Sequence, residues 1–135
     1  MKLIRINRAE WMRGSGMGKL YDPFSKLKCC IGIACEQLGC PLENMRGIGD
    51  VAGLIEEGNA YLVPNEFKMY CFQDKFDYND EIIGQYEVAE ERLGLQDAYE
   101  TNDNKDITDI EREIKLMTIF RDKLNLDIEF YGESR

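Results

Sequence analysis

The strongest hydrophobic pattern in the chain lies in residues 28–41, a nearly uncharged stretch that holds four of the five cysteines. Within it, apolar side chains recur at positions i, i+3, i+4 and i+7, the spacing of one helix face: Ile31, Ala34, Cys35 and Leu38. Gly39 can take the left-handed conformation that ends a helix, and a proline two residues later cannot continue one. The pattern predicts a short buried helix that ends near Leu38.

A second helix is predicted to begin at Thr108. Thr108 and Glu111 have the spacing of a capping box, in which each side chain accepts a hydrogen bond from the backbone of the other residue. The helix is expected to continue to about residue 124 with its apolar side chains facing inward: Ile110, Ile114, Met117, Phe120 and Leu124. Residues 102–104, Asn-Asp-Asn, are expected to form a turn before it.

Strands are predicted at both ends of the chain. Residues 2–6 are apolar and β-branched at alternate positions, and residues 126–131 alternate with Leu126, Ile128 and Phe130 on the side expected to be buried. We therefore predict an α+β fold in which these two segments pair in a small antiparallel sheet. Three or four helices are expected to cover the sheet.

The segments between these elements show no boundary between domains. Short helical pieces separated by glycines are expected in residues 41–64, and a longer helix in residues 79–93. There is no internal repeat, low-complexity run or linker, and 135 residues are enough to bury a core without metals or disulfides. Residues 1–135 are therefore expected to form a single domain.

Charge is distributed unevenly along the chain. The net charge is −9, but residues 1–46 hold 8 Lys and Arg against 4 Asp and Glu, a net +4, which leaves −13 for residues 47–135. An acidic protein repels the phosphate backbone, so direct binding to nucleic acid is not expected. Acidity serves solubility, and it also suits docking onto a basic partner, for which Glu87, Glu90 and Glu91 are the candidate residues.

The expected location is the cytoplasm. No apolar run is long enough to span a bilayer, and the first residues lack the apolar segment and cleavage site of a signal peptide. A reducing compartment favours free thiols, which agrees with the odd number of cysteines.

Several kinds of catalytic and metal site are excluded by residue type. The chain has no histidine, which rules out Ser-His-Asp and Cys-His nucleophilic catalysis. Cys30, Cys35 and Cys40 are spaced five apart, so they do not share a helix face on which to hold zinc. The cysteines are expected to pack as small apolar side chains. We predict no metal, no cofactor and no catalytic residue, while an enzyme based on carboxylates or a cysteine stays open as the weakest hypothesis.

The glycine-rich segment 13–19 invites comparison with a phosphate-binding loop. It departs from the Walker pattern twice, because Arg13 stands where the first glycine is required and Leu20 follows Lys19 in place of Ser or Thr. A glycine loop can still bind an anion through backbone N–H groups, and the bland alternative is a flexible connection. The candidate ligand-binding residues are Arg5, Arg8, Arg13, Gly14, Gly16, Gly18 and Lys19.

Three short motifs occur in a distinctive order. They are Glu10-Trp11-Met12-Arg13-Gly14, then Lys28-Cys29-Cys30-Ile31-Gly32, then Asn102-Asp103 followed by Thr108-Asp109-x-Glu111-Arg112-Glu113 and the closing Phe120 and Ile128-Glu129-Phe130. In these motifs the chain resembles a family of small proteins encoded by phages, prophages and bacteria, with a Trp-x-Arg-Gly start, a Cys-Cys-Leu-Gly centre and an Asn-Asp turn before a final helix and strand. Ile31 stands where leucine is usual, and residues 48–80 match poorly.

The resemblance implies an origin but no chemistry. The family has no established activity, so it implies no catalytic residue; it does imply a phage or prophage source. Our leading hypothesis is a non-enzymatic accessory protein that binds and inhibits a host component, such as a CRISPR or other defence system, through its acidic surface. The alternative is a small-molecule binder that sequesters an anionic nucleotide signal at the glycine loop.

Overall fold

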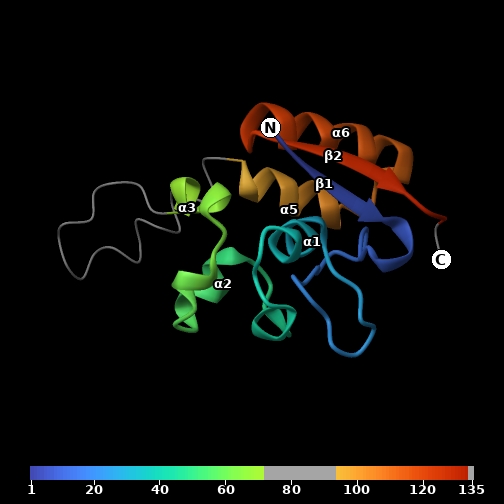
Figure 1. Cartoon of the computed structure of the whole chain (residues 1–135). Coiled ribbons are helices and arrows are strands. Elements are labelled where there is room, and N and C mark those ends of the chain that lie inside the picture. Colours follow the sequence, from blue (N-terminus) through green and yellow to red (C-terminus); the bar gives the residue numbers. More distant parts are fainter. Residues whose placement is uncertain (72–93, 134–135) are drawn as a thin grey trace.

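The computed structural model describes residues 1–71 and 94–133, which form two strands and a group of helices (Figure 1). The described elements are, in chain order, β1 (Lys2–Asn7), the 3-10 turn η1 (Arg8–Glu10), α1 (Cys30–Gln37), η2 (Leu42–Met45), α2 (Val51–Glu56), η3 (Ala60–Leu62), α3 (Asn65–Cys71), α5 (Leu95–Asp103), α6 (Asp109–Lys123) and β2 (Leu126–Tyr131). The mixture of helix and strand confirms the α+β prediction. The helix expected over residues 79–93 lies outside the described residues.

The two terminal strands pair as predicted, but they run parallel. Lys2 lies beside Leu126 and Asn7 beside Tyr131, so the expected antiparallel pairing is wrong. The reason is α6, which lies along the sheet and turns at Asn125, a residue with φ of 58°, directly into β2. A parallel pair needs such a helical crossover, and the alternation in β2 indicates a buried face without fixing the strand direction.

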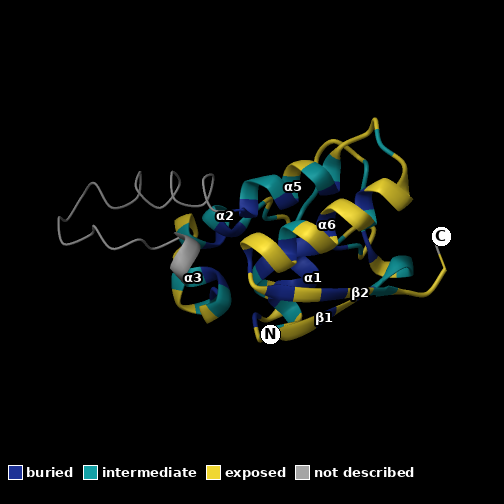
Figure 2. Ribbon diagram, turned by 90° about the horizontal axis from the view of Figure 1, so that it is seen from above, coloured by how far each residue is buried: buried dark blue, intermediate teal, exposed yellow. Residues whose placement is uncertain are grey.

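One face of this sheet forms part of the core. Ile4, Ile6, Leu126 and Ile128 are all buried, and each contributes roughly 1.5–3 kcal/mol through loss of contact with water. Helix α1 lies next to β1, and α6 lies over β2. Figure 2 shows that the strands run along one side of the molecule and that buried and exposed residues alternate along them. The helices therefore cover one face of the sheet and leave the other exposed.

Helix α1 matches the predicted buried helix, and Gly39 follows its end with φ of 112°. Its burial is more complete than the predicted single apolar face, because every residue from Cys30 to Cys35 is buried. Gly32 permits this close packing. A Cβ atom at that position would lie 1.9 Å from the carbonyl oxygen of Leu20, a distance that only glycine avoids.

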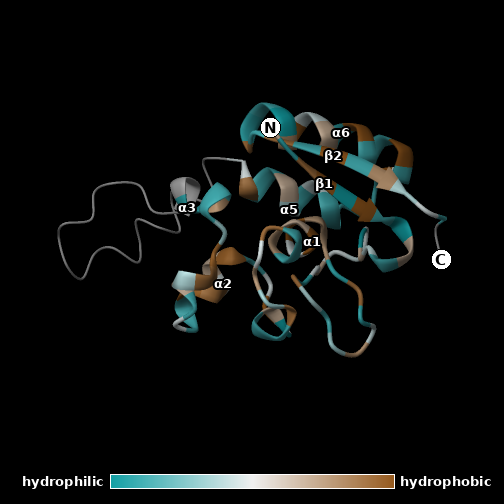
Figure 3. Ribbon diagram, in the orientation of Figure 1, coloured by the Kyte–Doolittle hydropathy of each residue, from teal (hydrophilic) through white to brown (hydrophobic). Residues whose placement is uncertain are grey.

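The capping box of α6 is confirmed, but the predicted inward face is largely wrong. The Thr108 hydroxyl accepts the Glu111 N–H, and the Glu111 carboxylate accepts the Thr108 N–H. Of the residues expected to face inward, Phe120 and Leu124 are buried, whereas the other three are exposed: Ile110 by 73%, Ile114 by 60% and Met117 by 43%. In Figure 3 the apolar colour on α6 is strongest near the end of the helix that lies beside the tip of β2.

Two residues displace the predicted apolar face of α6 from the core. Arg112 and Leu116 are buried instead, on the same side of the helix as Phe120. An arginine at the core is unexpected from its charge, and its hydrogen bonds, described below, make this burial possible.

The predicted turn at residues 102–104 is also wrong in part, because Asn102 and Asp103 form the last turn of α5. Asparagine and aspartate favour turns when their side chains bond the local backbone. Here the Asn102 side chain is fully buried and bonds to distant residues, so tertiary contacts override the local preference.

Candidate functional site

Asn102 is the centre of a buried polar cluster that joins the three sequence motifs. Its Oδ1 atom accepts hydrogen bonds from Trp11 Nε1 at 2.7 Å and from the Cys30 N–H at 3.0 Å. Its Nδ2 atom donates to the Met12 carbonyl oxygen at 2.9 Å and to Asp103 Oδ1 at 3.0 Å. All four hydrogen-bonding positions of the amide are therefore used, as a fully buried amide requires.

Arg112 extends this cluster to the end of α5. Its guanidinium Nη1 donates to the carbonyl oxygens of Thr101 and Asn104, both at 2.8 Å, and of Asn102 at 3.2 Å. Nη2 donates to the Ile107 carbonyl at 3.2 Å. The last carbonyls of a helix have no partner within the helix and favour a nearby cation. Arg112 thus stabilises the end of α5, which explains why a residue only 3% exposed can be charged.

Arg13 connects the Trp-x-Arg-Gly motif to the start of α6. Its Nη1 donates to the carbonyl oxygens of Trp11 at 2.9 Å and Arg8 at 3.1 Å. Its guanidinium lies 4.6 Å from the centre of the Trp11 ring, and its Nε lies 3.2 Å from Asp109 Oδ2. Asp109 also approaches Arg112, at 3.4 Å, so one carboxylate lies between two arginines. These contacts hold Arg13 in place, and its side chain is only 12% exposed.

The glycine loop is built around the end of α5. The Gly14 N–H donates to the Asn102 carbonyl at 2.8 Å, and the Gly16 N–H donates to the Asp103 carbonyl at 3.0 Å. Both glycines have positive φ, of 67° and 82°, and a Cβ at Gly18 would lie 2.4 Å from an oxygen of the Asp103 side chain. The glycines therefore let the loop pack closely on the helix. An anion at these two N–H groups would have to replace the carbonyls of α5.

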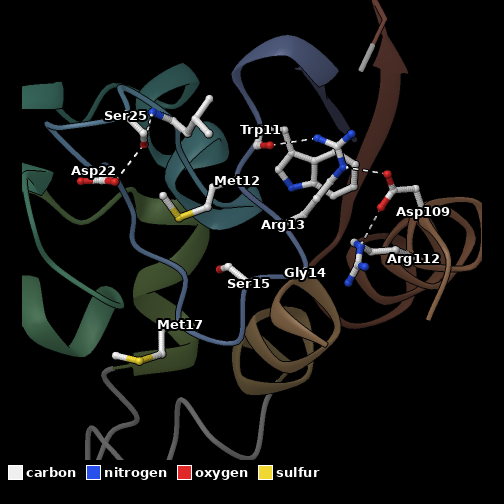
Figure 4. Close-up of a pocket in the computed structure, with 11 residues that line it drawn as sticks. Trp11, Met12, Arg13, Gly14, Ser15, Met17, Asp22, Ser25, Asp109 and Arg112 are labelled. Carbon is white, nitrogen blue, oxygen red and sulfur yellow. Dashed lines mark hydrogen bonds and ion pairs between the residues drawn. The ribbon is translucent and has the colours of Figure 1, made fainter. Parts of the chain in front are cut away.

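A cleft of about 730 Å³ lies beside this loop (Figure 4). Its walls carry Arg13 and Asp109 on one side and Asp22 and Ser25 on the other, with the loop's Ser15 between them. Ser25 Oγ donates to Asp22 Oδ2 at 2.8 Å. This hydrogen bond, followed by that from the Phe24 N–H, lowers the pKa of Asp22, so the carboxylate stays ionised and is a poor proton donor at neutral pH.

The structure does not gather all the predicted ligand-binding residues at this cleft. Arg13 and Gly14 line it, while Gly16 lines a shallower depression beside α5. Gly18 lies against Asp103, and Lys19 is close enough to contribute to the lowered pKa of Asp22.

The two remaining arginines of the prediction point elsewhere. Arg8 forms a two-bond ion pair with Glu113 of α6, with both distances at 2.8 Å, and donates to the Gly132 carbonyl. The hydrogen bond from Arg8 to Glu113 raises the pKa of Arg8. Arg5 lies on the exposed face of the sheet, 3.2 Å from Glu129 and over the ring of Tyr131. Anion binding by these residues stays a prediction, and each arginine has an intramolecular carboxylate partner.

A charged cluster missed by the sequence analysis lies where both strands end. Lys28 Nζ is 2.7 Å from Glu36 Oε1 and 3.4 Å from Glu10 Oε1, and the lysine side chain is 10% exposed. These residues line a cleft of about 230 Å³ together with Asn7 and Tyr131. Desolvation lowers the pKa of Lys28, but the hydrogen bond and charge of Glu36, with those of Glu10, raise it overall. The lysine therefore stays protonated and is a poor nucleophile. The feature of the sequence that could have indicated this cluster is the position of Lys28 at the edge of an apolar stretch.

Four cysteines are buried: Cys29, Cys30, Cys35 and Cys40. Cys29 caps α1, with its Sγ accepting the Gly32 N–H at 3.4 Å. Burial raises the pKa of Cys29 to about 12 and that of Cys30 well above its ordinary value, so neither thiol ionises near neutral pH. The described residues hold no group of three side chains placed to bind a metal.

The predicted partner-binding residues Glu87, Glu90 and Glu91 lie outside the described residues. In the part of the chain that is described, no helix is long and apolar enough to cross a membrane. No family model, curated protein or solved structure matches the chain.

Proposed function

We propose that the chain is a non-enzymatic, phage-type accessory protein that binds a host protein with a basic surface and inhibits it. Its action takes place in the host cytoplasm, and the first targets to test are antiviral defence proteins, such as CRISPR effectors. The resemblance of its motifs to proteins of phages and prophages supports this origin, and the net charge of −9 supports a basic partner.

The observation that carries the proposal is the exposed apolar stripe on α6. Ile110, Ile114 and Met117 follow one another at helical spacing, and their side chains are 73%, 60% and 43% exposed. Single exposed apolar residues are ordinary on a protein surface, whereas a contiguous row on one helix is typical of an interaction site. Figure 2 shows exposed residues along the outward side of α6.

The stripe lies beside β2. Helix α6 covers β2 while α1 lies next to β1, so β2 is the strand nearer to α6. On α6, Glu113 reaches Arg8 at the end of the sheet, and Lys123 pairs with Asp97 of α5. Successive residues of a helix are rotated by about 100° around its axis. Viewed along the axis of α6, the stripe therefore lies next to Glu113, on the side of Glu113 that is away from Lys123. We call the three stripe residues together with β2 the α6–β2 surface.

The charge of this surface favours a basic partner. Asp127 and Glu129 are exposed on the outer face of β2. Arg5 pairs with Glu129, and among the described residues no other ion pair involves these two carboxylates. A partner that places lysine or arginine against β2 and an apolar side chain against α6 would complement both parts of the surface.

The test compares two substitutions on the same helix. Ile114→Glu places a charge within the stripe, whereas Thr118→Glu places the same charge on an exposed position beside it. Both variants should keep the wild-type melting temperature, because neither side chain belongs to the core. Immobilised wild type and T118E should retain the same basic host protein from lysate and release it when salt is added, whereas I114E should not retain it. In a phage-infection assay, wild type and T118E should protect the phage from host defence, and I114E should not.

If I114E protected the phage as well as wild type does, the α6–β2 surface would be overturned as the binding site. Replacing Glu87, Glu90 and Glu91 by lysine tests the acidic segment predicted from the sequence. Loss of protection there, with I114E unaffected, would move the binding site away from the α6–β2 surface.

A further inference from the structure

The two edges of the small sheet differ. On β1, the outward-facing groups of Arg5 are both occupied, because its N–H donates to Gln37 Oε1 at 2.9 Å and its carbonyl accepts from Gln37 Nε2 at 2.6 Å. The amide of Gln37 thus imitates a neighbouring strand and closes this edge. Among the described residues, β2 pairs with β1 alone, so its other edge has no strand beside it.

The register shows which groups β2 presents at that edge. Because Arg5 directs its N–H and carbonyl away from β2, its neighbour Ile4 directs its own groups toward β2. Ile4 lies beside Ile128, and in a parallel pair such a residue bonds to the positions before and after its partner, here Asp127 and Glu129. The alternate residues Leu126, Ile128 and Phe130 therefore direct their N–H and carbonyl groups away from β1. Leu126 is only 1% exposed, so the groups available at this edge are those of Ile128 and Phe130.

We propose that the partner binds by adding one of its own strands to this edge of β2, a strand in which basic and apolar residues alternate. The inference rests on the proposed function and names its mode of recognition. Outward-facing side chains of the added strand would lie beside Asp127 and Glu129, where lysine or arginine pairs with the carboxylates. Inward-facing side chains would meet the apolar stripe of α6. Strand addition supplies main-chain hydrogen bonds, and the side chains supply specificity.

A second copy of the chain fits this edge poorly. Two β2 strands related by a two-fold axis pair antiparallel, with Asp127, Ile128 or Glu129 at the axis. Each of these registers places a carboxylate opposite a carboxylate: Asp127 against itself, Asp127 against Glu129, or Glu129 against itself. Like charges directly opposite each other destabilise a strand pair, so the edge is suited to a basic strand.

The test uses two short synthetic peptides, one alternating lysine with valine and one alternating glutamate with valine. Amide hydrogen exchange of the full chain is followed by NMR with and without each peptide. The lysine peptide should slow exchange at Ile128 and Phe130 roughly tenfold or more, while the amides of Asp127 and Glu129, already bonded to β1, change little. The glutamate peptide should have no effect, and I114E should weaken binding of the lysine peptide roughly tenfold, whereas T118E should not.

The following results would overturn strand addition. Strand addition would be excluded if neither peptide slowed exchange at the amides of Ile128 and Phe130, or if both peptides protected these amides equally. Protection of the same amides in the free protein at high concentration, together with a dimer in sedimentation, would assign the edge to a second copy. These results leave the proposed α6–β2 binding surface intact, because that surface is rejected only if I114E keeps its activity against the host.

Discussion

The buried polar cluster and the α6–β2 surface are opposite in their hydrogen bonding and their exposure. At the cluster, polar groups are inside the protein and are paired with one another: Asn102 alone bonds to four other residues. At the surface, apolar side chains lie in water and alternate backbone groups of β2 have no neighbouring strand among the described residues. Helix α6 belongs to both regions, because Arg112 faces the cluster and Ile110 faces solvent.

The difference teaches where to look for function in this chain. The motifs that stand out in the sequence, around Trp11, Cys30 and Asn102, meet in the cluster and hold the fold together. Residues that build such a network cannot be replaced without loss of stability, whatever the protein binds. The α6–β2 surface has no motif, and a binding surface needs none, since exposed side chains can change without disturbing the core.

The largest effect that tests this comparison is expected from Asn102→Ala. The change leaves Trp11 Nε1 and the Cys30 N–H buried without their partner and removes the bond to the half-buried Met12 carbonyl, so we expect a loss of about 3–5 kcal/mol in the free energy of unfolding. The measurement is urea denaturation. Asn104→Ala is the matched control, because that side chain is exposed and accepts one bond, from the Asp106 N–H; it should cost less than about 1 kcal/mol. Similar midpoints for the two variants would contradict a structural role for the cluster.

A second pair of variants tests the two faces of α6. Leu116→Ala opens a cavity in the core and should cost about 2–5 kcal/mol, because Leu116 is fully buried. Ile114→Ala, two positions away, removes a side chain that is 60% exposed and should change stability by about 0.5 kcal/mol or less. If Ile114→Ala destabilises the protein as much as Leu116→Ala, the apolar stripe is part of the core and the proposed binding surface is lost.

The sequence predicts the helices and strands of the fold better than it predicts which of their faces are buried and which residues they contact. The terminal strands, α1 and the capping box of α6 carry strong local signals, so they were found within a residue or two. Helix α5 was missed because Asn102 and Asp103 resemble a turn, and only their distant partners make them helical. The inward face of α6 was misjudged because Arg112 displaces it, and the carbonyls that stabilise Arg112 belong to another element.

The candidate site was less predictable for the same physical reason. Glycines in a loop indicate a special backbone, but the sequence does not show whether their N–H groups face an anion or, as at Gly14 and Gly16, the end of a helix. Likewise, Lys28 forms ion pairs with Glu10 and Glu36 only after folding brings together η1 and α1. Nor does the alternation in β2 indicate which of its edges is open.

A smaller effect is expected from the buried thiols at high pH. Burial raises the pKa of Cys29 from 9.0 to about 12, so between these values the folded protein keeps a proton that the unfolded chain has lost. Stability should therefore fall as the pH rises from about 9 to 12, by up to ~1.4 kcal/mol per pH unit for this group. Other groups titrate there, so the measurement is the difference between wild type and Cys29→Ala in urea denaturation at pH 8 and pH 10. A variant with the same pH slope as wild type would show that Cys29 ionises in the folded protein.

The smallest effect concerns the first turn of α6, where the two regions meet. Thr108→Ala removes the hydroxyl that accepts the Glu111 N–H, and the loss of such a cap costs about 0.5–2 kcal/mol. The loss should appear in urea denaturation. A change too small to measure would show that Arg112 fixes the start of the helix without the cap.

The pH dependence of that cap provides an independent check. The hydrogen bonds that Glu111 accepts from the Thr108 backbone and side chain lower the pKa of Glu111 below its ordinary value of 4.5. The folded protein thus binds a proton less readily than the unfolded chain, so the contribution is present above pH 4.5 and is lost as the pH falls through the lowered pKa. Glu111→Gln removes this titration, and its stability should fall less than that of wild type on acidification. Because α6 places Arg112 in the cluster and Ile110 on the surface, a weakened first turn should lower both stability and partner binding, whereas I114E should lower partner binding alone.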